Sequence, residues 1–194
     1  MLEIRFHGRG GGGTVVLATL LAKAFFQAGY HVQSFPFFGV ERRGAPVEAY
    51  LRLDHKKILA RTNVITPDHV VVQDESLIED MGVMRGLKPG GWILLNCSAF
   101  PSDTGIFANY RVAVVDATGI ALANKIGSRT HPIVNTAMIG AFARVMGTPP
   151  LHIVVEAIKK EVPSDPENNV RAAEEAYREV RFARSSMNEV INEE

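Results

Sequence analysis

The sequence has few of the residues that would build a self-contained catalytic or metal centre. It contains one cysteine, Cys97, so it can form no internal disulfide and cannot alone supply the four thiolates of an iron–sulfur cluster. Its six histidines show no H-x-x-x-H or similar ligand spacing, and no serine lies in a nucleophile-elbow motif. We therefore predict no metal site and no catalytic residue, and we expect Cys97 to be a small buried residue at a strand end.

An excess of charge and a long hydrophobic run are also missing. The 21 basic residues balance the 21 acidic ones, which argues against a dedicated nucleic-acid-binding protein. The apolar segment 15–26 is too short to span a bilayer and is interrupted by Lys23. The first residues lack the positive and apolar regions of a signal peptide. We expect no nucleic-acid partner, no membrane partner and a cytoplasmic location.

Apolar segments alternate in type along the chain, and this alternation predicts an α/β fold. A hydrophobic content of 46% in 194 residues fits one domain, residues 1–194, with a real core. We expect an α/β/α three-layer domain whose sheet is mixed and mostly parallel, with a hairpin between 47–53 and 58–60. Other strands are expected at 2–6, 30–35, 70–74, 92–96 and 111–116. Helices are expected at 15–28, 75–85, 117–126, 135–146, 151–160 and 166–185, followed by a polar tail, 186–194.

The most distinctive stretch is a glycine-rich loop between the first strand and the first helix. Five of the six residues from Gly8 to Gly13 are glycine, so few side chains keep a ligand away from the backbone. The backbone N–H groups of such a loop, at the positive end of a helix, suit a phosphate or a carboxylate. The candidate binding residues are Gly8, Arg9, Gly10, Gly11, Gly13 and Thr14.

The ligand of this loop is not defined by its glycines. Gly8, Gly10 and Gly13 fit the dinucleotide spacing G-x-G-x-x-G, but no acidic residue for a ribose occurs between Glu3 and Glu41. The loop also resembles a P-loop that lacks its lysine. A tight turn without a ligand is the alternative. Arg9 is either a bidentate phosphate contact or a solvated loop residue.

A second candidate follows the second predicted strand. Phe37 and Phe38 could anchor a partner protein, and Arg42 and Arg43 could contact anions. Loops at the carboxyl ends of strands gather around one crevice, so this segment is expected beside the glycine loop. The alternative is an ordinary charged loop held by a pair between Glu41 and an arginine.

Three further residues lie at predicted strand ends. Asp74, which follows Gln73, and Asp116 could form a pair of carboxylates for acid–base chemistry, but helix N-capping is the expected role of both. His7 adjoins the glycine loop, where a strand-end contact is expected.

At these stretches the chain resembles the gamma subunits of 2-oxoacid:ferredoxin oxidoreductases. Residues 8–13 resemble the G-R-G-G-Q-G opening of that family, with Gly12 in place of the glutamine. Residues 35–47, FPFFGVERRGAPV, resemble its F-P-x-F-G-x-E-R-R-G-A-P-V segment, which is the most specific part. Residues 67–74 and 133–141 resemble its P-D-x-x-x-x-x-D and I-x-N-x-x-x-L-G-A stretches. The resemblance covers about residues 2–150.

The resemblance implies a non-catalytic but required subunit of a complex that converts a 2-oxoacid and coenzyme A to acyl-CoA and CO2 while reducing ferredoxin. It implies alpha, beta and delta partner subunits, with thiamine diphosphate and Mg²⁺ in alpha and beta and 4Fe–4S clusters in beta and delta. The glycine loop would then receive the phosphates of coenzyme A or form a subunit contact.

Pyruvate is the expected 2-oxoacid. The alternatives are 2-oxoglutarate, a branched-chain 2-oxoacid or an aryl pyruvate. A free-standing nucleotide-binding module is a further alternative, weakened by the missing acidic residue.

Overall fold

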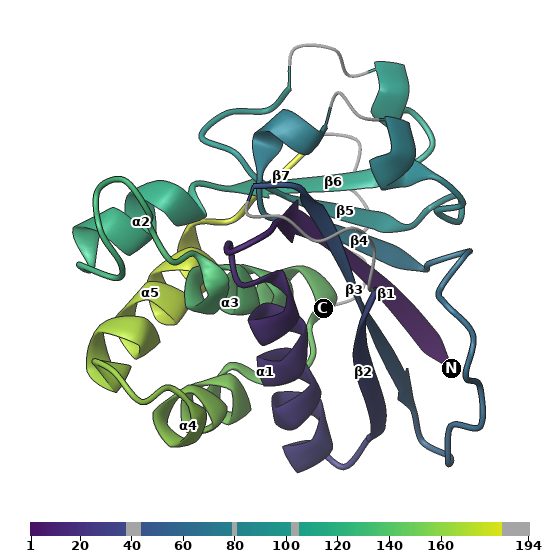
Figure 1. The fold of residues 1–194 in the computed structure, drawn as a ribbon, viewed down its shortest axis with the longest axis horizontal. Coiled ribbons are helices and arrows are strands. Elements are labelled where there is room, and N and C mark those ends of the chain that lie inside the picture. The colour runs from purple at the N-terminus through teal and green to yellow at the C-terminus, as the bar shows by residue number, and fades with distance from the viewer. Residues whose placement is uncertain (38–43, 79–80, 102–104, 184–194) are drawn as a thin grey trace.

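The centre of the protein is a mixed β-sheet (Figure 1). The computed structural model describes residues 1–37, 44–78, 81–101 and 105–183, and within them seven strands follow the order β2-β3-β1-β4-β5-β6-β7. The parallel part comprises β1 (Leu2–Arg9), β4 (His69–Val72), β5 (Trp92–Asn96) and β6 (Arg111–Val115). The antiparallel strands are β2 (His31–Phe37), β3 (Pro46–Asp54) and β7 (Arg181–Phe182).

The predicted hairpin between residues 47–53 and 58–60 is wrong. Residues 58–60 form no strand, because β3 already pairs with β1 on one edge and with β2 on the other. The alternating pattern of β3 was identified correctly, but its partners lie earlier in the chain. The sheet is nevertheless mixed, as expected.

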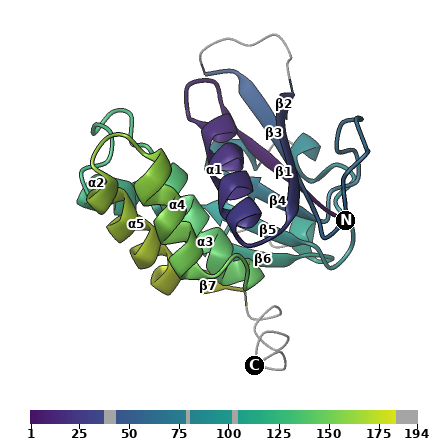
Figure 2. The same cartoon turned by 90° about the horizontal axis from the view of Figure 1, so that it is seen from below.

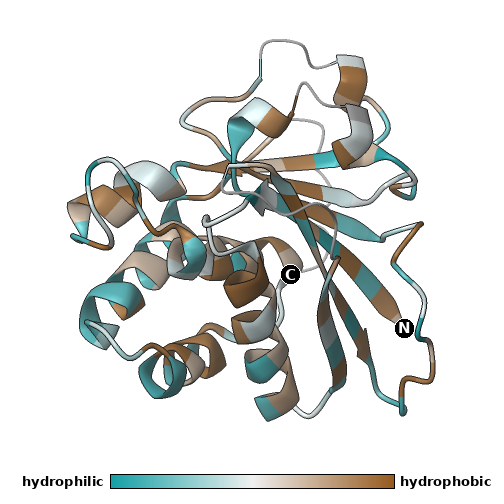
Figure 3. Cartoon of the chain, viewed as in Figure 1, coloured by the Kyte–Doolittle hydropathy of each residue, from teal (hydrophilic) through white to brown (hydrophobic). Residues whose placement is uncertain are grey.

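Five α-helices cover one face of the sheet (Figure 2) within the described ranges. They are α1 (Thr14–Gln27), α2 (Ala117–Ala123), α3 (Asn135–Met146), α4 (Leu151–Glu161) and α5 (Pro166–Glu179). Figure 3 shows hydrophobic residues along the strands and on the covering helices, whereas α5 carries many hydrophilic ones. Alanines and Gly140 on α3 allow α5 to approach closely, since a Cβ at Gly140 would lie 1.9 Å from the Ala173 carbonyl oxygen.

Short 3₁₀ helices cover part of the opposite face. They are η1 (Glu75–Leu77), η2 (Met81–Met84) and η3 (Gly105–Phe107). The expected helix 75–85 is therefore wrong, since Gly82 and Gly86, the latter at φ 73°, disfavour a continuous α-helix there. A second apolar core lies beneath these turns, formed by residues such as Val70, Val72, Ile93 and Leu95. The α/β class is confirmed, with a second layer of 3₁₀ helices and loops.

The last helix is shorter than expected. It ends at Glu179, because Val180 has extended backbone angles and leads into β7, which pairs with β6. The predicted helix end at residue 185 is wrong, and the predicted polar tail 186–194 lies outside the described residues.

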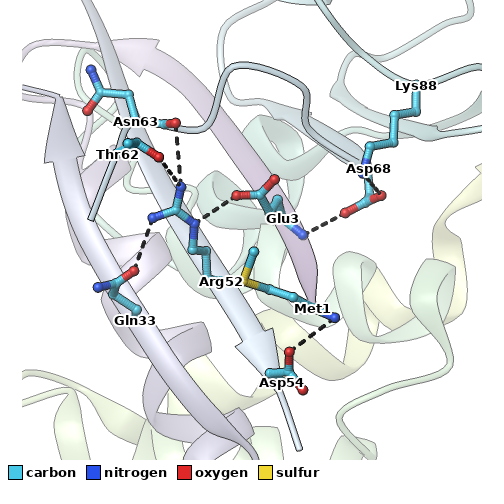
Figure 4. Close-up of polar contacts among 9 residues, drawn as sticks. All are labelled: Met1, Glu3, Gln33, Arg52, Asp54, Thr62, Asn63, Asp68 and Lys88. Atoms are coloured by element: carbon cyan, nitrogen blue, oxygen red, sulfur yellow. Dashed lines mark hydrogen bonds and ion pairs between the residues drawn. The ribbon is translucent and has the colours of Figure 1, made fainter. Parts of the chain in front are cut away.

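The face of β1–β3 that lies opposite α1 buries charge (Figure 4). Register places Gln33, Arg52 and Glu3 side by side on three neighbouring strands. Arg52 as a residue is 1% exposed; its Nε donates to Glu3 Oε1 at 2.7 Å and a terminal nitrogen donates to Gln33 Oε1 at 3.1 Å. A charged side chain can be buried here because these oxygens replace its water.

Candidate functional site

The site lies where the chain leaves the parallel strands in opposite directions. From β1 the chain continues through α1 to β2 on one side, whereas from β4 it continues to β5 and β6 on the other. In open α/β sheets such a switch point forms a crevice at the carboxyl ends of the strands. Here the crevice lies at Arg9 of β1 and at Gln73, just after β4.

The glycine loop extends the pairing of β1 with the segment before β3. The Gly10 N–H donates to the Ala45 carbonyl at 2.8 Å, and the Gly44 N–H donates to the Gly10 carbonyl at 3.0 Å. The prediction that the segment after the second strand lies beside the glycine loop is therefore confirmed at Gly44 and Ala45. The predicted interface residues Phe38, Glu41, Arg42 and Arg43 lie outside the described residues.

Arg9 ties the loop to the rest of the crevice. Its Nε donates to Asp74 Oδ2 at 2.9 Å, and its two terminal nitrogens donate to the Gly44 carbonyl and to Ser76 Oγ. These contacts give Arg9 a structural role that neither of its two predicted roles included. A phosphate contact by Arg9 stays a prediction and would compete with these bonds.

The first turn of α1 offers backbone donors that have no acceptor within the helix. Gly13 is the N-cap, at φ 77°, and as a glycine it supplies no capping side chain. The first intrahelical acceptor serves Leu17, so the N–H groups of Thr14, Val15 and Val16 have no acceptor within the helix. The first turn also carries no acidic residue. This end of α1 therefore carries a partial positive charge that suits an anion.

A cavity of about 690 Å³ lies in front of this helix end. Its walls are the glycine loop, the first turn of α1, and residues Val47, His131 and Pro132. None of these described lining residues is acidic. The cavity thus combines backbone donors with an apolar wall.

Two glycines allow other side chains to pack under the loop. A Cβ at Gly8 would lie 2.1 Å from Thr14 Oγ1, and one at Gly13 would lie 2.5 Å from Asn135 Nδ2. Gln73 Nε2 donates to Asn135 Oδ1 at 2.9 Å, and both residues are buried. Sequence reasoning did not assign Asn135 to the site. Only its place in a family-like motif singled it out, because its contact with the loop spans more than a hundred residues.

A second cavity, of about 430 Å³, lies on the other side of the loop. Asp74, Glu75 and Asp116 line it, with Arg9 as the one cation among its described lining residues. Asp74 accepts from the Ser76 N–H at 3.0 Å and Asp116 from the Gly119 N–H at 2.7 Å. The prediction that both carboxylates cap helices is confirmed. This acidic cavity is a poor site for a phosphate.

Cys97 is buried, as expected, and His7 is buried as well. Burial, helped by the Glu75 carboxylate, raises the pKa of the Cys97 thiol to about 12, so it stays protonated. His7 Nε2 accepts a 2.9 Å hydrogen bond from Arg5 Nε, which is the predicted strand-end contact.

Phe37, the described member of the predicted interface, is at the end of β2. Its side chain is partly exposed, and its ring lies 6.3 Å from that of Tyr50. The part of the chain that the structure describes contains no cluster of three or more potential metal ligands. None of its helices is long and apolar enough to cross a membrane.

Comparison with known proteins agrees with this fold. The family model for pyruvate ferredoxin/flavodoxin oxidoreductase matches residues 3–179. The chain therefore belongs to the pyruvate ferredoxin/flavodoxin oxidoreductase family, and the predicted resemblance to its gamma subunits is confirmed.

Individual relatives match over nearly their full length. Pyruvate synthase subunit PorC of Methanocaldococcus jannaschii is 48% identical, with 93% of this chain and 97% of the relative covered. The pyruvate/ketoisovalerate oxidoreductases common subunit gamma of Thermococcus kodakarensis is also 48% identical, with 91% and 96% covered. The crystal structure of pyruvate oxidoreductase subunit PORC from Thermotoga maritima superposes with a TM-score of 0.77 at 34% identity, covering 94% of this chain and 98% of that one. The chain is thus a subunit of a multisubunit oxidoreductase.

Proposed function

We propose that this chain is the gamma subunit of a complex that oxidatively decarboxylates pyruvate with coenzyme A to acetyl-CoA and CO2 and reduces ferredoxin, in a reversible reaction. The assignment of pyruvate as the substrate rests on one observation: the relatives at 48% identity include a pyruvate synthase subunit. Alpha, beta and delta subunits would supply thiamine diphosphate, Mg²⁺ and 4Fe–4S clusters; the single cysteine of this chain cannot alone supply the four thiolates of such a cluster.

A second substrate is supported by a specific observation. The Thermococcus relative is a subunit common to pyruvate and ketoisovalerate oxidoreductases. This chain could serve two complexes in the same way if its contacts with substrate are few. Purification of the native complex, followed by assay with pyruvate, ketoisovalerate and 2-oxoglutarate in the presence of coenzyme A and a viologen acceptor, tests the substrate. A chain that purifies without any thiamine- or cluster-bearing partner would contradict the proposal.

Within the complex, we infer that the cavity at the start of α1 binds the phosphates of coenzyme A. Three backbone N–H groups without helical acceptors face an environment without described acidic residues, whereas the cavity across the loop holds three carboxylates. An anion is therefore favoured on the α1 side by both the helix dipole and local charge. The apolar wall at Val15, Val16 and Val47 would exclude water from the bound phosphates.

The substitution Val16→Asp tests this role. Val16 is exposed, lies in the first turn of α1 and lines the cavity. An aspartate at this position would stabilise the N-terminus of the helix, yet it would repel a phosphate bound in the cavity. In the assembled complex we expect KM for coenzyme A to rise about tenfold more than in the uncharged control Val16→Asn.

The same variants separate binding from assembly. Equal KM values for the Asp and Asn variants would contradict a phosphate site. Dissociation of the Asp variant from its partner subunits on gel filtration, with KM unchanged in the remaining complex, would instead make the loop a subunit contact.

A further inference from the structure

A long segment without helix or strand, residues 55–68, joins β3 to β4 (Figure 1). It lies at the far end of the sheet from the glycine loop. Leu53 at the end of β3 pairs with Leu2 at the start of β1, whereas the glycine loop follows the other end of β1. Connections of this length without secondary structure are uncommon in compact domains and usually have a function.

The second half of this segment is fixed to the body of the domain. Arg52, buried on β3, donates to the Asn63 carbonyl at 3.4 Å (Figure 4). Val64 is buried, and the Ile65 carbonyl packs so closely on the Gly86 backbone that a Cβ at Gly86 would lie 2.2 Å from its oxygen. The segment is therefore held in place by the domain itself, which lowers the entropy cost of binding a partner there.

The same segment exposes apolar side chains. Residues 58–60, which do not form the expected strand, include Leu59, which is 77% exposed, and Ile65 farther along is 72% exposed. These two are the most exposed large hydrophobic residues in the part of the chain that the structure describes. Figure 3 shows hydrophobic and hydrophilic stretches alternating along the segment. Two such side chains on one anchored loop, among polar residues, are typical of an interaction surface.

Positive charge accompanies these apolar side chains. Three exposed residues of the segment are cations: Lys56, Lys57 and Arg61. None of them forms an ion pair within the described ranges, and residues 55–67 contain no aspartate or glutamate. The two flanking carboxylates are already engaged, because Asp54 pairs with the N-terminal amine and Asp68 pairs with Lys88. A surface that complements this segment therefore carries carboxylates.

We propose that segment 55–68 is a docking surface for an acidic face of another subunit of the oxidoreductase. Leu59 and Ile65 insert into apolar recesses of that face, and the three cations pair with the carboxylates around them. A small anion would gain nothing from the apolar side chains. A second copy of this chain, docked through the same segment, would bring like charges together. A carboxylate-bearing subunit satisfies both kinds of side chain.

Carbodiimide cross-linking of the assembled native complex tests this surface without any variant. The reagent joins a lysine amine to a carboxylate where the two are in contact. We expect Lys56 or Lys57 to be joined to an aspartate or glutamate of a different subunit, identified by mass spectrometry. Links from these lysines only to a second copy of this chain, or no link from either, would overturn the proposal.

The double variant Lys57→Glu/Arg61→Glu tests the contribution of charge. Both positions are exposed, so the Tm of the variant chain should be unchanged. At about 0.05 M salt we expect Kd for dissociation of the complex, measured by mass photometry on dilution, to rise about tenfold, and at about 0.5 M salt only about twofold. Lys160→Glu/Arg171→Glu, at exposed positions of α4 and α5, changes the net charge equally and should leave Kd as it is. An equal rise in Kd in this control would contradict a specific surface.

Leu59→Ser tests the contribution of the apolar side chains. We expect Kd to rise about tenfold at both salt concentrations, because the lost contact is hydrophobic. The control Phe26→Ser, at a position of α1 that is 69% exposed, should leave Kd unchanged. In the intact complex both segment variants should keep KM for coenzyme A, unlike Val16→Asp, so a failure of the coenzyme A site would leave these results standing. Unchanged Kd in Leu59→Ser and in Lys57→Glu/Arg61→Glu would overturn the docking surface alone.

Discussion

The two faces of the sheet bury different kinds of polar group. Under the α-helices, the buried polar side chains are neutral amides and hydroxyls together with His69. On the opposite face of β1 and β3, the buried polar residues are Arg5, His7 and Arg52, which alternate along the strands with core residues such as Ile4 and Leu51. The helical face therefore excludes charge, whereas the other face pairs it.

The covering layer explains the difference. Closely packed helices leave no partner for a charge, whereas the loops and 3₁₀ helices opposite present carbonyl groups, and β1 itself supplies a carboxylate. The Arg5 guanidinium donates to the carbonyls of Val83 in η2 and of Arg85 just after it, and Arg52 is held by Glu3 of β1 and by the carbonyl of Asn63 in the loop after β3. Burial lowers the pKa of Arg5, which shows that its surroundings still disfavour charge. We therefore expect close packing to determine which substitutions the helical face tolerates, and charge pairing to determine which ones the opposite face tolerates.

The largest effect is expected on the helical face, at Gly140. In Gly140→Ala the added Cβ would overlap the Ala173 backbone, so α3 and α5 must separate. We expect the free energy of unfolding to fall by about 4 kcal/mol, measured by urea denaturation. Gly147→Ala is the control, since nothing lies within 4 Å of its Cβ and only its positive φ opposes the change, at a cost of about 1 kcal/mol. Similar losses in both variants would contradict the tight helix contact.

A somewhat smaller effect is expected on the charged face. Arg52→Met removes the cation and leaves Glu3 without its partner, so we expect a loss of about 3 kcal/mol in the free energy of unfolding. Adding Glu3→Gln removes the unpaired charge and should recover part of the loss. If the double variant is no more stable than Arg52→Met, packing by the arginine stem, and not charge pairing, stabilises this face.

The smallest effect depends on pH and involves His69 under the helices. Burial lowers its pKa to about 4, while its Nδ1 accepts from the Trp92 N–H. Below pH 6.5 the unfolded chain binds the proton more readily, so this group lowers stability as pH falls, by about 2 kcal/mol at pH 5. His69→Asn, which keeps an acceptor for Trp92, should flatten the stability profile between pH 6.5 and 4. The control His152→Asn, at an exposed position, should leave the slope of the profile as it is. An unchanged slope in His69→Asn would mean that another group causes the loss of stability in acid.

Sequence patterns found those parts of the molecule that local chemistry determines. The apolar strands, the helix after the glycine loop and the caps at Asp74 and Asp116 follow from periodicity and residue type. The hairpin at 58–60 was wrong because strand pairing depends on contacts distant in sequence, which the pattern of β3 does not reveal. For the same reason the glycine loop was found, whereas the roles of Gln73 and Asn135 beneath it were not.

The contacts of Arg9 also bear on the order of folding. This residue is among the first ten of the chain, yet its partners lie 35, 65 and 67 residues later. Forming these contacts closes long loops, and the entropy lost in closing them opposes the contacts until the strands have paired. The glycine loop is therefore ordered only once β3 and β4 have joined the sheet. A chain still emerging from the ribosome therefore carries the complete glycine sequence without the folded loop that the proposed anion site requires. Ligand binding at this loop would then report that the domain has finished folding.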